Sequence, residues 1–438
     1  MEKEVTLTMT QKQINRYHVI MDSLEGKLTV AAAAAALGVS ERQVTRLRNG
    51  VKEEGAAFLI HKNKGRASPR AVTEEEKKEI VELYRGDMYS GANFVHYSEL
   101  LSEHEGIRLS RPTVHRVLKA AGIESPKKRR RFKPHRSRKR KAQEGLLTQI
   151  DASPFEWFGG RSKYALHGGI DDATGKIVGA HMTKNECLLG YYEVIRQVIE
   201  RDGIPTSAYS DRHSIFLSPK ADKLSVQEQL DGKAINDTQF GRAMKELGIT
   251  MIHARSPQAK GRIERLWETL QSRLVIEFRI RGIKTVDAAN EFLVDYLPMF
   301  NEKFAVEPEL SEKVYRENTL DLDLVLCVKE NRVADKGGVF SFSGKLWKIM
   351  NDGLPGSKFN VEVIASPARG ILALYKGRVL DVLPYVKPKK TSPERKQPST
   401  LGHHAHGNWE SSQPRYSFDL ADSEIRKMLE DVFLSKYA

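Results

Sequence analysis

Residues 255–274 read Arg-Ser-Pro-Gln-Ala-Lys-Gly-Arg-Ile-Glu-Arg-Leu-Trp-Glu-Thr-Leu-Gln-Ser-Arg-Leu. The Ser-Pro pair and Gly261 indicate a turn, after which apolar residues recur at the spacing of one helix face. These apolar residues are Ile263, Leu266, Trp267, Leu270 and Leu274. Glu264 follows the first of them directly, so a packed helix can hold its carboxylate at the edge of the buried face. Three cations surround it, Lys260, Arg262 and Arg265. This mixture favours a site that binds a cation and an anionic polymer together.

Two aspartates in the preceding part of the chain fit the same site. Asp151 ends a short apolar segment, residues 146–151, and Asp211 ends another, residues 207–211; both segments are predicted strands. Hard cations such as Mg²⁺ prefer oxygen ligands, so carboxylates that converge from rigid elements suit metal-assisted phosphoryl chemistry. Taken singly, either aspartate is an ordinary residue of a turn after a strand.

The three acidic segments together resemble a known family. Residues 149–154 (Gln-Ile-Asp-Ala-Ser-Pro) with Trp157, residues 209–211 (Tyr-Ser-Asp) and residues 256–265 resemble the acidic blocks of the DDE transposases of bacterial insertion sequences, which share the retroviral-integrase catalytic core. The resemblance implies an RNase H-like core. It also implies that Asp151, Asp211 and Glu264 are catalytic and hold two Mg²⁺ or Mn²⁺ ions per active site.

The spacing of the acids departs from that family in one respect. Asp211 and Glu264 are separated by 52 residues, more than the compact spacing common in such transposases. Residues 217–237 are polar and lack apolar periodicity, so we interpret them as an insertion, which surface loops tolerate.

Composition restricts the partners. The chain has 438 residues, a formal net charge of +14 and 40% hydrophobic residues, which predicts several domains with real cores and a polyanionic partner. No apolar run is long enough to span a bilayer, and the amino terminus lacks the apolar core of a signal peptide. We therefore expect no membrane association and a cytoplasmic, nucleoid-associated protein of a bacterium. Cys187 and Cys327 are the only cysteines, which excludes a disulfide framework and a cysteine-based zinc site.

Residues 1–60 are predicted to form a helix-turn-helix DNA-binding domain. Residues 30–37 are an alanine-rich helix, Gly38 provides the turn, and residues 40–43 (Ser-Glu-Arg-Gln) match a capping box that opens the second helix. The outward residues of this second helix suit phosphates and guanine edges. They are Arg42, Thr45, Arg46 and Arg48. The alternative is an ordinary helical hairpin with a solvated basic face.

Residues 71–125 are predicted to form a second helix-turn-helix domain. Ser110 is the expected N-cap of its last helix, and Pro112 lies in the permissive first turn. The expected DNA contacts are Arg111, His115 and Arg116. No second ligand lies at metal spacing from the histidine, so we interpret it as a phosphate or solvent contact.

A basic linker, residues 126–145, follows. Residues 126–141 contain eleven Lys or Arg in sixteen positions, a density that is solvated or bound to a polyanion. The segment is predicted to be disordered in isolation and to follow DNA phosphates when bound. The DNA-binding candidates here are Lys127, Lys128, Arg129, Arg130, Arg131, Arg138, Lys139 and Arg140, joined by Lys260, Arg262 and Arg265 of the helix described first.

The rest of the chain is predicted to be an α/β core followed by strands. Residues 146–320 alternate strands and helices, with three strands before the first helix, which indicates an antiparallel meander continued by parallel units. Asp171 and Asp172 are interpreted as turn residues between two of these strands. Residues 325–386 contain five short predicted strands, a small β-barrel, and residues 387–438 form a flexible tail that ends in a helix.

Together with the family resemblance, these features predict a multidomain transposase: helical helix-turn-helix domains, an α/β RNase H-like core and a C-terminal barrel. Such a protein binds the ends of a mobile DNA element, cleaves them and joins the 3′-hydroxyl ends to target DNA. We expect a homodimer or higher oligomer on paired ends. Two other functions share these features, a catalytically silent DNA-binding regulator of the element and a nuclease without strand transfer.

Overall fold

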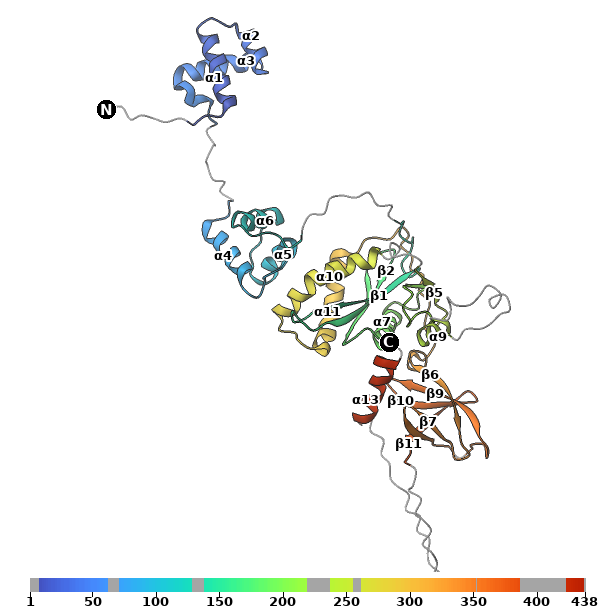
Figure 1. Ribbon diagram of the computed structural model, residues 1–438. Helices are drawn as coiled ribbons and strands as arrows, with labels where there is room; N and C mark the ends of the chain where they lie inside the picture. The colour runs from blue at the N-terminus through green and yellow to red at the C-terminus, as the bar shows by residue number, and fades with distance from the viewer. Residues whose placement is uncertain are drawn as a thin grey trace, which may run out of the picture. The chain divides into compact units, whose positions relative to one another are not determined.

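The computed structural model describes residues 8–61, 71–127, 138–218, 237–254, 261–351, 353–386 and 423–436. The chain divides into two compact units, residues 1–79 and residues 80–438. Figure 1 shows the elements of each unit in order along the chain. Within the described residues, no helix combines the length and the apolar character needed to cross a bilayer.

The first unit is helical. It contains α1 (Gln11–Leu24), α2 (Val30–Leu37), α3 (Glu41–Glu54) and a short 3-10 helix (Gly55–Leu59). Gly38 ends α2 in the left-handed conformation, with φ of 62°, and the Ser40 hydroxyl accepts a hydrogen bond from the Gln43 N–H at the start of α3. The predicted turn between the two helices is confirmed. Its small core is formed by Ile20, Ala33, Ala34, Val44, Val51 and Leu59.

The next three helices carry the second helical segment. They are α4 (Glu74–Arg85), which spans the boundary between the units, α5 (Phe94–His104) and α6 (Arg111–Ala120). Tyr84, Tyr97 and Leu118 form part of their core, which Ile276 of a later helix also joins. Ser110 occupies the predicted N-cap of α6, but its hydroxyl lies 2.8 Å from the Thr113 hydroxyl and makes no capping bond to the backbone.

A five-stranded sheet forms the centre of the second unit. Its strands are β1 (Thr148–Phe155), β2 (Tyr164–Asp171), β3 (Ile177–Thr183), β4 (Ser207–Ser210) and β5 (Thr250–His253), in the order β3-β2-β1-β4-β5. The first three strands are antiparallel, and β1, β4 and β5 run parallel. This is the antiparallel meander with parallel units that the sequence predicts.

Four helices pack with this sheet in two clusters (Figure 1). One cluster joins α7 (Leu188–Arg201) and α9 (Gln239–Glu246) to Ile150 and Ala208 of the sheet. The other joins α10 (Gly261–Ile280) and α11 (Val286–Phe304) to residues of β2 and β3. All five apolar residues that predicted the α10 face are buried. The amphipathic character predicted for that helix is confirmed.

The predicted end of the first strand is wrong. We expected it to end at Asp151, but β1 continues to Phe155, so the aspartate lies inside the strand. The strand continues because its residues as far as Phe155 pair with β2, whose partner at that end is Tyr164. The parallel neighbour β4 ends earlier, at Ser210, and leaves that side of β1 open beyond it.

The C-terminal sheet has six strands, not the five predicted. After α12 (Leu322–Val325) come β6 (Val328–Ala334), β7 (Val339–Phe342), β8 (Lys345–Ile349), β9 (Phe359–Ser366), β10 (Gly370–Tyr375) and β11 (Arg378–Pro384). Their order, β6-β9-β10-β11-β8-β7, gives a nearly closed, barrel-like sheet. The missed strand is β6, an edge strand whose sequence Val-Lys-Glu-Asn-Arg-Val-Ala is mostly polar and lacks the apolar residues that predicted the other five.

The last helix packs into the chain's own core. It comprises α13 (Ser423–Asp431) and a short π-helix (Val432–Lys436). The buried residues of this segment belong to the same cluster as α7 and the C-terminal strands; they are Ile425, Met428, Leu429, Val432 and Phe433. The helix predicted at the end of the tail is confirmed, and residues 387–422, predicted to be flexible, lie outside the described residues.

Candidate active site

Two of the three predicted acids lie at the same level on neighbouring strands. Strands β1 and β4 are parallel, with Thr148 opposite Ala208 and Gln149 opposite Tyr209. Continued by two residues, this register brings Asp151 level with Asp211, the first residue after β4. Both carboxylates are half-buried. The Asp211 carboxylate is oriented by the His213 N–H, which donates to its Oδ1 over 2.9 Å.

The helix that carries Glu264 is tied to the first of these acids. Trp267 of α10 donates its indole N–H to Asp151 Oδ2 over 3.1 Å. Glu264 lies in the first turn of α10, three residues before Trp267, and residues at that spacing are neighbours on a helix surface. Its side chain is exposed.

The structure does not gather the three acids into a finished metal cluster. Among the described residues, no three His, Cys, Asp or Glu side chains converge closely enough to hold a metal ion. Residues 255–260, which lead into α10, lie outside the described part of the chain, as does most of the predicted insertion at 217–237. The three predicted ligands nevertheless carry only carboxylate oxygens, the donor atoms that Mg²⁺ and Mn²⁺ prefer.

A buried tyrosine beside the two aspartates was missed in the sequence. The Tyr191 hydroxyl of α7 donates to Glu186 Oε1 over 2.6 Å. Burial raises the pKa of Tyr191 well above its ordinary value, and the negative charges of Glu186, Asp151 and Asp211 raise it further. The tyrosine therefore remains a neutral hydrogen-bond donor near the acids. In the sequence it is one apolar-face residue of an amphipathic helix, with no signal that separates it from core residues.

The predicted turn at Asp171 and Asp172 is confirmed, but both carboxylates are completely buried. Asp171 Oδ1 accepts hydrogen bonds from the N–H and hydroxyl of Thr174, both 2.8 Å long. Burial raises the pKa of Asp171. Asp172 binds the side chains of Gln149, Arg138 and Arg262, so it joins segments that are distant in the sequence.

The predicted DNA-contacting residues of the helical segments lie mostly on the surface. On α3, Arg42, Thr45 and Arg46 are exposed and Arg48 is half-buried. The α6 candidates Arg111, His115 and Arg116 are also exposed. Arg111 donates to the Glu99 carboxylate over 3.0 Å, so it already has an intramolecular partner.

The predicted DNA contacts of the basic linker and α10 have more varied surroundings than those of α3 and α6. Lys127 and Arg265 are exposed, and Lys139 pairs with Glu309 over 3.0 Å. Arg138 and Arg262 bind Asp172. Arg140 donates to the main-chain carbonyls at 172 and 173. The remaining candidates lie outside the described residues; they are Lys128, Arg129, Arg130, Arg131 and Lys260.

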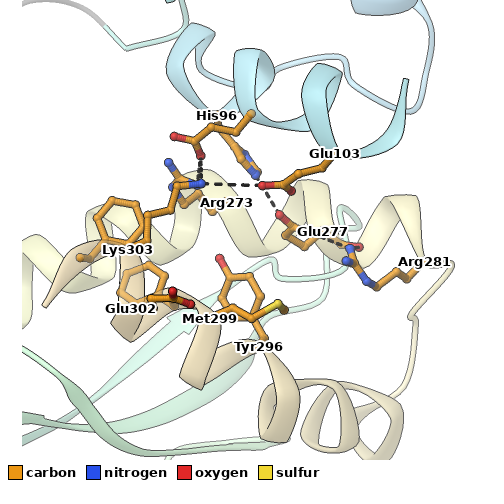
Figure 2. A pocket seen from close by; sticks show the side chains of 12 residues that line it. His96, Glu103, Arg273, Glu277, Arg281, Tyr296, Met299, Glu302 and Lys303 are labelled. Carbon is orange, nitrogen blue, oxygen red and sulfur yellow. Dashed lines mark hydrogen bonds and ion pairs between the residues drawn. The ribbon is translucent and has the colours of Figure 1, made fainter. Parts of the chain in front are cut away.

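A separate cavity of about 450 Å³ lies among α5, α10 and α11, and none of the three acids lines it (Figure 2). Ion pairs cross between the helices here. His96 of α5 lies 2.9 Å from the Glu277 carboxylate of α10, and Glu99 of α5 pairs with Arg273 over 2.8 Å and with Lys303 of α11 over 2.6 Å. These contacts hold α5 against the C-terminal half of α10, away from Glu264.

Comparison with known proteins gives the family. Residues 16–78 match the family model of winged helix-turn-helix domains. The chain is 34% identical over 367 residues to the transposase for insertion sequence IS1202 of Streptococcus pneumoniae, an alignment that covers 76% of this chain and 77% of that protein. The chain belongs to the insertion-sequence transposases. This transposase is also 35% identical over 341 residues to y4bF of Sinorhizobium fredii, covering 77% and 72% of the two chains.

Two solved viral structures also align with the transposase, at low identity and low TM-score. A simian T-cell lymphotropic virus intasome in complex with the PP2A regulatory subunit B56 gamma has a TM-score of 0.31 and 14% identity, covering 66% of the transposase and 92% of that chain. The HTLV-2 integrase catalytic core domain in complex with magnesium has a TM-score of 0.24 and 19% identity, covering 34% and 83%.

Proposed function

We propose that this transposase binds the ends of its mobile DNA element, cleaves them and joins the freed 3′-hydroxyl ends to target DNA. Asp151, Asp211 and Glu264 are the catalytic carboxylates of this proposal. The observation that carries it is the shared level of the two aspartates on parallel strands, with the Glu264 helix bonded to the first of them through Trp267. The core that presents them is RNase H-like in this proposal.

The three carboxylates would hold two Mg²⁺ or Mn²⁺ ions, because they supply only oxygen ligands. When bound, such ions activate the attacking oxygen and stabilise the leaving oxygen of a phosphodiester. The protein's part is to keep the carboxylates oriented before DNA arrives. Trp267 supports this role by restraining Asp151, and the His213 N–H by restraining Asp211.

DNA recognition in this proposal begins with α3. The exposed Arg42, Thr45 and Arg46 lie on the second helix of a helix-turn-helix, the element that reads base edges in the major groove. The exposed residues of α6 and the basic linker add contacts to phosphates. Joining two element ends to one target requires the two ends to be held together, so the working form is a dimer or a higher oligomer.

The test is cleavage and joining of labelled DNA that carries the element's terminal repeats. Wild-type protein with Mg²⁺ should nick the ends and join their 3′-hydroxyls to target DNA, whereas Asp151→Asn and Asp211→Asn should bind the ends without cutting. Nicking without joined product would favour the nuclease function. Specific binding by wild-type protein without any cleavage would favour the silent regulator.

A further inference from the structure

The completely buried carboxylate of Asp172 binds more groups than any turn requires. Its Oδ1 accepts from Arg262 over 2.6 Å, from Gln149 over 2.6 Å and from Arg138. Its Oδ2 accepts from the main-chain N–H of Lys141 over 2.9 Å. A buried carboxylate with this many donors is held in one orientation.

The groups on Asp172 come from three other segments of the chain. Arg138 and Lys141 belong to the end of the basic linker, and Arg262 belongs to the first turn of α10. Gln149 belongs to β1, two residues before Asp151. Linker and helix are also bonded to each other, because Arg262 donates to the Arg138 carbonyl over 2.6 Å.

The location of these contacts connects them to the candidate active site. Arg262 lies two residues before Glu264 on the same helix turn, and Gln149 lies opposite Tyr209, two residues before Asp211. The Arg138 guanidinium lies 6.0 Å from the centre of the Tyr209 ring. Two partners of Asp172 therefore lie two residues before an acid on the same element, Arg262 before Glu264 and Gln149 before Asp151. The third acid, Asp211, follows Tyr209, which is the strand neighbour of Gln149.

Charge explains why one carboxylate can fix two arginines. The side chain of Arg262 is 17% exposed, and burial lowers the pKa of this guanidinium. Two guanidiniums at one place repel each other, so a negative charge between them is needed to hold both. If the Asp172 charge is removed, the lowest-energy arrangement has one or both arginines in solvent, which loosens the segments that carry them.

We propose that Asp172 is a positioning residue of the transposase, which fixes the first turn of α10 and the end of the basic linker relative to β1. It thereby sets the position of Glu264 relative to the two aspartates. It also sets where DNA bound to the linker enters the candidate active site. The effect of this positioning on catalysis rests on the proposed function. Its effect on how α10 and the linker pack against β1 does not.

The experiment is hydrogen–deuterium exchange of the full-length protein without metal or DNA, comparing wild type with Asp172→Asn. Exchange should become at least about tenfold faster at residues 265–268, whose N–H groups bond to the first turn of α10, and at the Lys141 N–H, which corresponds to about 1.4 kcal/mol in local opening free energy. Asp171→Asn is the matched control, an equally buried neighbour whose side chain binds Thr174 and the Gly145 N–H. Its faster exchange should be confined to residues 144–146 and 172–176.

Two further variants test the α10 contact and the linker contact of Asp172 separately, and they test the proposal if Asp172→Asn does not fold. Arg262→Gln should speed exchange chiefly in the first turn of α10, and Arg138→Gln chiefly in residues 138–141. Unchanged exchange of the α10 first turn in Arg262→Gln, or equal loosening of that turn in Asp171→Asn, would overturn the proposal.

Activity gives the second readout. Arg262→Gln should lower kcat for end cleavage by about tenfold while KM for end DNA changes by less than about threefold, as expected for loss of positioning. If KM alone rises, Arg262 is a DNA contact and the positioning role is wrong. Absence of cleavage by wild type would refute the proposed function, while the exchange result would still decide the role of Asp172.

Discussion

The indole N–H of Trp267 lies 3.1 Å from Asp151 Oδ2 and donates a hydrogen bond to it. This bond joins α10 to β1 at the candidate active site. Because one partner is a carboxylate, the bond is of the stronger kind, and it restrains a side chain that we propose as a metal ligand. The same tryptophan is buried in the apolar face of its helix, so the restraint is as rigid as the helix packing.

Trp267→Phe should keep the packing and remove the restraint. We expect end cleavage to fall by about 10- to 100-fold, since a hydrogen bond to a charged group contributes about 1.5–3 kcal/mol. DNA-end affinity should stay unchanged. Trp157→Phe is the control, because this buried indole donates to the Ser153 carbonyl instead. Equal losses of activity in both variants would show that packing, not the bond to Asp151, matters.

Glu264→Gln separates binding from chemistry. It keeps the shape of the side chain and removes the charge, so cleavage and joining should fall at least about a hundredfold. End-DNA binding, measured by fluorescence anisotropy, should survive or tighten because a repulsion of phosphate is removed. Glu268→Gln, one turn along the same exposed side of α10, should be mild. The opposite ranking of the two variants would place the catalytic glutamate at 268.

Divalent cations should control activity. Mg²⁺ or Mn²⁺ should support cleavage, and Ca²⁺ should support it poorly, because the larger ion does not keep the tight octahedral oxygen geometry. The measurement is end cleavage in protein treated with chelator and then supplied with each ion. Undiminished cleavage in excess chelator would contradict the carboxylate assignment altogether.

The arginines of α3 should dominate the salt dependence of end binding. In the full-length protein, Arg42→Gln combined with Arg46→Gln should weaken binding and reduce the slope of log K against log salt by about 0.9 for each phosphate that is no longer neutralised. Lys52→Gln, at the exposed far end of the same helix, is the control. A slope that the double variant leaves unchanged would exclude α3 from binding phosphates.

The ion pairs of Figure 2 should make α5 packing sensitive to acid. Burial raises the pKa of the Glu99 carboxyl, but bonds from Arg273 and Lys303 outweigh it and leave the pKa below its ordinary value of 4.5. The stabilisation that the ion pairs of Glu99 provide is therefore complete above about pH 4.5. It is lost as the pH falls through the lower pKa that Glu99 has in the folded protein.

The matching variant is Glu99→Gln, measured by thermal unfolding across pH. At pH 7 it should cost about 3 kcal/mol, because it leaves the buried Arg273 without its partner. Glu103→Gln, whose side chain is 58% exposed, should cost little. The difference between wild type and Glu99→Gln should shrink below pH 4.5, and a constant difference would contradict the ionic origin of the stabilisation.

Much of the local structure follows from the sequence. The five-residue apolar face of α10, the glycine turn between α2 and α3, and the antiparallel-then-parallel strands were all predictable. The first two depend on residues close in the chain, through side-chain periodicity and a left-handed turn at Gly38, and the strand directions follow from the short or helical connections between the strands. The three acids of the candidate site stay a prediction from the resemblance to transposases, a family that the relatives confirm.

The remaining features depend on pairings between distant segments. Asp172 and Arg262 are 90 residues apart, and nothing in the turn sequence around the aspartate indicates that partner. Strand β6 is mostly polar and forms by pairing along its length with β9, and β1 runs past Asp151 because β2 continues beside it. A local sequence pattern indicates which residues of one helix or strand can be buried on the same face and which charged residues lie near one another. Which other element covers them is decided by the global packing, because loop closure and core formation select among many locally equivalent partners.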